Sequence, residues 1–122
     1  MEEMKKKILV IGAEVGYGVA QALLSEGFDV KSAETHEEEF PRTVVFTELS
    51  LGIYDMVIVA YWASFDLMLE MRKRFPRVRI IFLNSYHYEM DEEAKRHGID
   101  AVVRVPFEHD ELLNEVRRVL AT

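Results

Sequence analysis

The sequence contains no cysteine, no long apolar run and no excess of positive charge. The absence of cysteine excludes disulfides, thiolate nucleophiles and sulfur-rich metal sites. The charged segment from Met1 to Lys7 precedes only a short apolar run, so the sequence shows neither a signal peptide nor a membrane span. We therefore expect a cytoplasmic protein with no membrane partner.

Acidic side chains outnumber basic ones, 22 against 15, and the net charge is -7. Nucleic acids and anionic membranes attract positive surfaces, so this balance argues against both as direct partners. Basic residues do cluster at Lys5–Lys7 and between Arg72 and Arg79, and we interpret both clusters as solvated faces. Amide side chains are scarce while Glu, Lys and Arg are frequent, which is a thermophile-like bias.

The 122 residues, 49% of them hydrophobic, are enough for one compact domain spanning the whole chain. Short, continuously apolar runs rich in Val and Ile are typical of strands buried on both faces of a parallel sheet. Four such runs stand at Ile8–Ile11, Met56–Ala60, Arg79–Leu83 and Ala101–Val105, with a weaker fifth at Asp29–Ala33.

Residues between these runs show the three-and-four spacing of amphipathic helices. The predicted helical stripes are Val15–Leu23 before Gly27, Asp66–Arg74 between a Ser64 cap and Pro76, Tyr86–His97 before Gly98, and Leu112–Leu120. A helix over Arg42–Leu51, ended by Gly52, is predicted because two parallel strands need a crossover there. The alternation predicts a doubly wound α/β domain with a parallel sheet and helices on both faces.

Two segments near the end of the chain carry a family resemblance. Gly98–Ala101 resembles the glycine-alanine-aspartate turn, and Val105–Phe107 the lysine-proline-phenylalanine ending, of chemotaxis-type response-regulator receiver domains. The resemblance extends over essentially the whole chain. It implies a five-stranded, flavodoxin-like sheet of order 2-1-3-4-5 and a role in two-component signal transduction.

The residues that perform receiver chemistry do not match. Receivers phosphorylate a carboxylate, hold a divalent cation with neighbouring acids, and bind the phosphoryl oxygens with a lysine and a hydroxyl. In this sequence the acidic pair falls on Gly12 and Ala13, the phosphoacceptor on Ala60, the hydroxyl residue on Asn84 and the lysine on Val105. The resemblance therefore implies a degenerate pseudo-receiver that is not an enzyme and uses neither a cofactor nor a metal.

Such a module would act through protein binding. Receivers pair through the face formed by their fourth helix, fifth strand and fifth helix, so the resemblance predicts a homodimer or protein-partner interface there. On this face the sequence places Arg96, His97, Arg104, Glu108, Arg117 and Arg118.

A competing hypothesis rests on the glycine loop that follows the first predicted strand. Glycines between a strand and a helix let backbone N–H groups approach a phosphate, and this loop resembles that of short-chain dehydrogenases. The alternative is a small Rossmann-like protein that binds a nucleotide or phosphate ester. Its candidate ligand-binding residues are Gly12, Glu14, Gly16, Gly18, Tyr61, Trp62 and Ser85. No tyrosine–lysine pair has the spacing that dehydrogenase catalysis requires.

Overall fold

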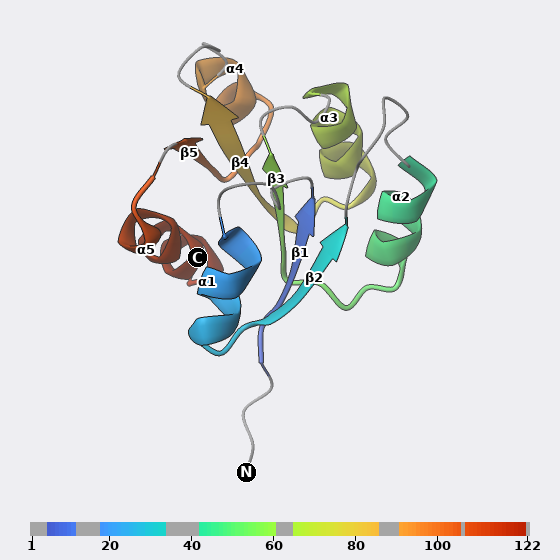
Figure 1. The fold of residues 1–122 in the computed structure, drawn as a ribbon. Coiled ribbons are helices and arrows are strands. Elements are labelled where there is room, and N and C mark those ends of the chain that lie inside the picture. Colours follow the sequence, from blue (N-terminus) through green and yellow to red (C-terminus); the bar gives the residue numbers. More distant parts are fainter. Residues whose placement is uncertain are drawn as a thin grey trace.

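The computed structural model describes residues 5–11, 18–33, 42–60, 65–85, 91–105 and 107–121, and in them strands and helices alternate (Figure 1). The strands are β1 (Lys7–Ile11), β2 (Asp29–Ala33), β3 (Met56–Ala60), β4 (Arg79–Ser85) and β5 (Ala101–Val105). The helices are α1 (Val19–Ser25), α2 (Arg42–Ser50), α3 (Phe65–Arg74), α4 (Asp91–Arg96) and α5 (His109–Leu120). This order confirms the alternation predicted from the sequence.

The five strands form one parallel sheet in the order β2-β1-β3-β4-β5. The register places Ile8 of β1 beside Val30 of β2 and Met56 of β3. The fold is therefore doubly wound and flavodoxin-like, and the order 2-1-3-4-5 is confirmed. Because all strands run in the same direction, their carboxyl ends meet at one edge of the sheet and their amino ends at the other.

Helices cover the sheet on both faces. Residues of α1 and α5, such as Leu23 and Val116, pack with Ile8 and Val10 on one face. Residues of α2, α3 and α4 pack with the alternate strand residues, such as Leu9, on the other face. Both faces of the sheet centre are thus buried, which explains why the inner strand β3 and the core residues 8–11 of β1 are continuously apolar instead of alternating.

Helix α2 forms in spite of β-branched and aromatic residues that favour strands. Val45 and Leu49, one helical turn apart, are buried against the sheet, and this packing outweighs the local preference. Gly27, Gly52 and Gly98 all have positive φ, at 87°, 69° and 87°, as predicted for residues that follow helix ends.

Three details differ from the sequence-based prediction. Strand β4 continues to Ser85, beyond the predicted end at Leu83, because its last residues pair with β5. Helix α2 ends at Ser50, and Leu51 lies in the following turn with 58% of its surface exposed. His97 is exposed in the turn after α4 and is not part of a buried helical stripe.

Candidate functional site

The residues that correspond to receiver chemistry lie at the carboxyl edge of the sheet. Ala60 is the last residue of β3, paired with Leu83 of β4, and Val105 is the last residue of β5, paired with Ser85. Asn84 directly precedes that edge. Gly12 and Ala13, which follow Ile11 of β1 in the sequence, lie outside the described residues.

The side chains available at these positions have little capacity for phosphoryl chemistry. A methyl group at 60 cannot act as a nucleophile, and an isopropyl group at 105 cannot bind phosphoryl oxygens as an ammonium would. Asn84 was expected to follow the fourth strand, but it lies within β4, opposite Arg104, and is fully buried. Among the described residues, no group of three or more acidic or histidine side chains is arranged to hold a metal ion.

The glycine loop of the competing hypothesis is described only at its end. Gly18 caps α1 with φ 59° and ψ 27°, and its carbonyl accepts a hydrogen bond from the Ala22 N–H at 2.9 Å. This left-handed conformation accounts for a glycine at position 18 without a ligand. The other candidates from this loop and from the segment after β3, namely Gly12, Glu14, Gly16, Tyr61 and Trp62, lie outside the described residues.

The six residues predicted to form a protein interface are all exposed. Two of them are held by acids within the chain: Arg117 contacts Glu26, after α1, at 2.7 Å, and Arg118 contacts Glu115 at 2.6 Å. The hydrogen bonds that Arg118 donates to Glu115 raise the pKa of Arg118 above its ordinary value. Arg117 therefore links α5 to the end of α1, and Arg118 is paired within its own helix. None of the described helices is both long and apolar enough to cross a membrane.

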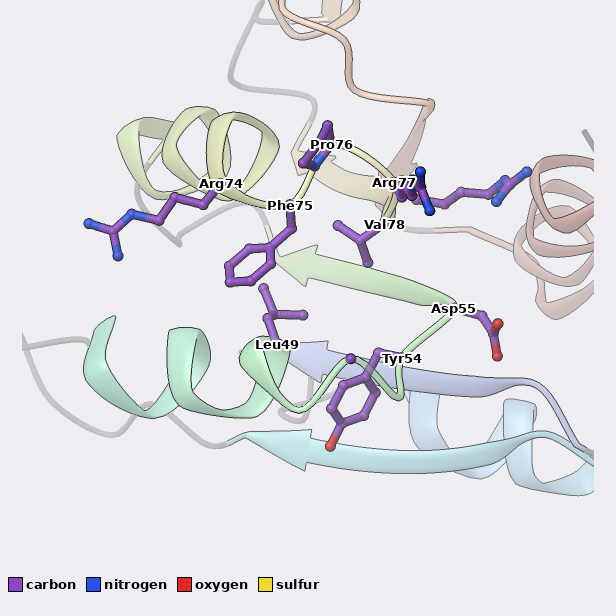
Figure 2. Close-up of a pocket in the computed structure, with 10 residues that line it drawn as sticks. Leu49, Tyr54, Asp55, Arg74, Phe75, Pro76, Arg77 and Val78 are labelled. Atoms are coloured by element: carbon purple, nitrogen blue, oxygen red, sulfur yellow. The ribbon is translucent and has the colours of Figure 1, made fainter.

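A cavity of about 460 Å³ opens at the opposite, amino edge of the sheet (Figure 2). The turn between α2 and β3 forms one wall, and the end of α3 with its turn into β4 forms the other. Its lining residues are Leu49, Gly52, Tyr54, Asp55, Arg74, Phe75, Pro76, Arg77, Val78 and Arg79. The arginines belong to the basic cluster between Arg72 and Arg79, which the sequence pattern alone indicates to be a solvated face. No sequence pattern reveals the cavity, because its two walls are about twenty residues apart in the chain.

Arg72 holds the second wall of this cavity in place. Its guanidinium donates to the carbonyl oxygens of Pro76 at 3.0 Å and Val78 at 2.7 Å. It also donates to the Gly98 carbonyl at 3.0 Å and to Asp100 Oδ2 at 2.7 Å. The same Asp100 oxygen accepts the Ile80 N–H at 2.8 Å. One side chain thus ties the α3–β4 turn to the turn that precedes β5.

A second polar network stabilises the first wall. The Tyr54 hydroxyl donates to Glu48 Oε2 at 2.7 Å, and Lys31 of β2 donates to the other carboxylate oxygen of Glu48. The hydrogen bonds from Lys31 and Tyr54 lower the pKa of Glu48. Burial, followed by the hydrogen bond to Glu48, raises the pKa of Tyr54 well above its ordinary value.

No family model and no curated protein sequence matches the chain, but solved structures do. The receiver domain of NtrX from Brucella abortus matches with a TM-score of 0.80 and 23% identity, over 94% of this chain and 98% of that domain. A response regulator from Thermotoga maritima matches with a TM-score of 0.79 and 22% identity, over 98% of this chain and all (100%) of that protein.

A longer NtrX chain, solved in complex with ADP, matches with a TM-score of 0.81 and 24% identity. That match covers 97% of this chain and 26% of NtrX, so the chain spans about a quarter of that protein. These likenesses show that the chain has the fold of response-regulator receiver domains.

Proposed function

We propose that this chain is a receiver-like regulatory module of signal transduction that acts without phosphorylation, by binding another protein. The observation that carries the proposal is Ala60 at the carboxyl end of β3, where receivers have the aspartate that they phosphorylate. Phosphoryl transfer to a protein side chain needs a nucleophilic oxygen. A methyl group offers none.

The other chemical positions support the same proposal. A new phosphoryl group carries negative charge, which a cation and a lysine neutralise in receivers. Gly12 and Ala13 stand where two metal-binding acids would be needed, and Val105 stands where the lysine would be. Replacement of one residue would leave the other phosphorylation-site residues in place. Here a neutral residue stands at each of these positions where receivers have a charged side chain.

Acetyl phosphate with magnesium, followed by intact mass spectrometry, tests this proposal. We expect no phosphoryl adduct on the natural chain under conditions that phosphorylate an ordinary receiver run in parallel. A chain with Gly12→Asp, Ala13→Asp, Ala60→Asp and Val105→Lys serves as the matched control, because it restores every charged member. An adduct on the natural chain would overturn the proposal.

The proposed protein-binding surface lies around the exposed edge strand β5, between α4 and α5. Arg96 and Arg104 are exposed there, as are Arg117 and Arg118 of α5. Sedimentation velocity at increasing concentration tests homodimerisation through this surface. We expect Arg104→Glu to weaken self-association and Lys73→Glu, the same charge change on exposed α3, to leave it unchanged. Equal effects of the two variants would contradict an interface at β5.

A second candidate function is binding of a nucleotide or phosphate ester at the glycine loop. It is favoured by the position of residues 12–18, which join the carboxyl end of β1 to the start of α1. Ligands of open α/β sheets bind at such strand ends. ADP and ATP are the first ligands to test, since NtrX was solved with ADP. A thermal shift with either nucleotide that disappears in Gly16→Val would favour this candidate.

A further inference from the structure

The cavity at the amino edge has an apolar centre. Leu49 and Val78 are buried, and Phe75 is partly buried and stacks on Phe46 with ring centroids 6.2 Å apart. Figure 2 shows the side chains of Leu49, Phe75 and Val78 pointing toward one another from α2, from the end of α3 and from the turn before β4. A volume of about 460 Å³ can accept a large side chain or a small molecule.

Exposed aliphatic side chains continue this apolar surface beyond the cavity. Leu51 and Ile53, on either side of the lining residue Gly52, are 58% and 45% exposed. Among the described residues only one other large hydrophobic side chain, Leu24, is similarly exposed, and it lies on α1. Two neighbouring exposed aliphatics beside an apolar hollow are typical of a surface that another molecule covers.

The charges around the cavity are mainly positive although the chain carries a net charge of -7. Arg74, Arg77 and Arg79 line it together with one acid, Asp55, whose Oδ2 already accepts the Lys7 N–H at 2.8 Å. Arg74 is also paired with Glu70, one turn earlier in α3, at 2.9 Å and lies over the Phe46 ring at 4.6 Å. Arg77 is therefore the main cation that the lining offers to a partner. Figure 2 shows Arg74 and Arg77 on opposite sides of the apolar centre. A partner complementary to this surface has an apolar centre with acidic groups on both sides.

From this arrangement we propose that the cavity binds an acidic segment of a partner protein, which inserts one large apolar side chain between α2 and the α3–β4 turn. A compact anion could not cover the exposed Leu51 and Ile53, whereas an extended segment can cover them and also meet the arginines of the lining. Arg72 fixes the carbonyls of Pro76 and Val78, so this wall is ordered before a partner binds.

The site lies at the opposite edge of the sheet from Ala60. If no partner segment binds the cavity, the proposal that the chain is not phosphorylated is unaffected. If the natural chain, which has Ala60, forms a phosphoryl adduct, the proposal on the cavity is unaffected. The two proposals concern separate surfaces of one fold.

A fluorescein-labelled peptide of sequence Asp-Glu-Phe-Glu-Asp is a suitable probe, read by anisotropy and by two-dimensional amide NMR of the whole chain. We expect saturable binding that weakens with added salt, and amide shifts confined to residues 49–55 and 74–79. Arg77→Glu and Leu51→Asp should each weaken binding at least about tenfold. Lys73→Glu, with the same charge change on an exposed residue outside the cavity lining, should change it little.

Other outcomes overturn the proposal. Equal weakening by Lys73→Glu and Arg77→Glu, or unchanged binding when Gly replaces Phe in the peptide, would mean nonspecific charge attraction. Phenylbutyrate that binds as tightly as the peptide would identify a small-molecule site instead. Self-association that is lost in Leu51→Asp would identify a second copy of the chain as the occupant. Circular dichroism of each variant confirms that its fold is retained.

Discussion

Arg72 is the residue whose removal should most disturb the amino edge of the sheet. Its guanidinium makes four hydrogen bonds of 2.7 to 3.0 Å, three to carbonyl oxygens and one to Asp100. Its side chain is only 19% exposed; the bond to Val78 is partly buried, while the other three lie at the surface. Arg72→Ala removes all four and frees the turn that carries Pro76 and Val78.

The expected cost follows from the number and kind of these bonds. A hydrogen bond to a charged group contributes about 1.5 to 3 kcal/mol when well shielded. Water can reach the freed carbonyls after truncation, so about 1 kcal/mol for each bond is the better figure, or about 3 to 4 kcal/mol in all. Small domains have a total stability of about 5 to 15 kcal/mol, so this is a large share. Urea unfolding followed by circular dichroism should show a midpoint lower by about 2 M.

Two further variants separate geometry from charge. Arg72→Lys keeps the charge, but one ammonium cannot reach four acceptors in three directions, so it should lose about 2 kcal/mol. A double-mutant cycle of Arg72→Ala with Asp100→Ala should give a coupling of about 1 kcal/mol, because both groups are partly exposed. A cost of Arg72→Ala below about 1 kcal/mol would refute the reasoning, since ordinary surface substitutions already reach half that value.

The remaining predictions concern the Glu48–Tyr54 network and the helix-ending glycines. The lowered pKa of Glu48 means that its contribution is complete above its ordinary pKa of 4.5 and is lost as the pH falls through the lowered value. Glu48→Gln should therefore reduce the free energy of unfolding at about pH 7, and this reduction should become smaller as the pH falls below 4.5 through the lowered pKa. The raised pKa of Tyr54 means that its neutral form is favoured in the folded state, so this contribution is present below about pH 10 and is lost above it. In a spectrophotometric titration Tyr54→Phe should remove a tyrosine that ionises above the ordinary tyrosine pKa of about 10, and removal of a step at about pH 10 would contradict the network. Gly98→Ala and Gly27→Ala, both at φ 87°, should each cost about 1 kcal/mol by thermal unfolding. The added Cβ meets only ordinary contacts with Arg72 at 3.5 Å in the first and none within 4 Å in the second, so a much larger cost at Gly98 would be unexpected.

The sequence alone determined the series of strands and helices. Strands buried on both faces must be apolar at every position, so Met56–Ala60 could be predicted to the residue. The edge strand Ala101–Val105 was also predicted to the residue, because its other four residues are apolar although Arg104 is exposed. Helix ends were predicted where a glycine could take a positive φ. The apolar run Met56–Ala60 also placed Ala60 at the end of a strand.

Only the tertiary structure decided which distant segments meet. Asn84 lies inside β4 because β5 offers it a partner, and nothing near residue 84 in the sequence indicates that pairing. Arg72 finds its acceptors as far away as Asp100, and Leu49 meets Phe75 across the amino edge. The spacing of apolar residues along the sequence indicates which face of a helix or strand is buried. Contacts between turns depend on the order and register of all the strands, and so the cavity was evident only in the folded chain.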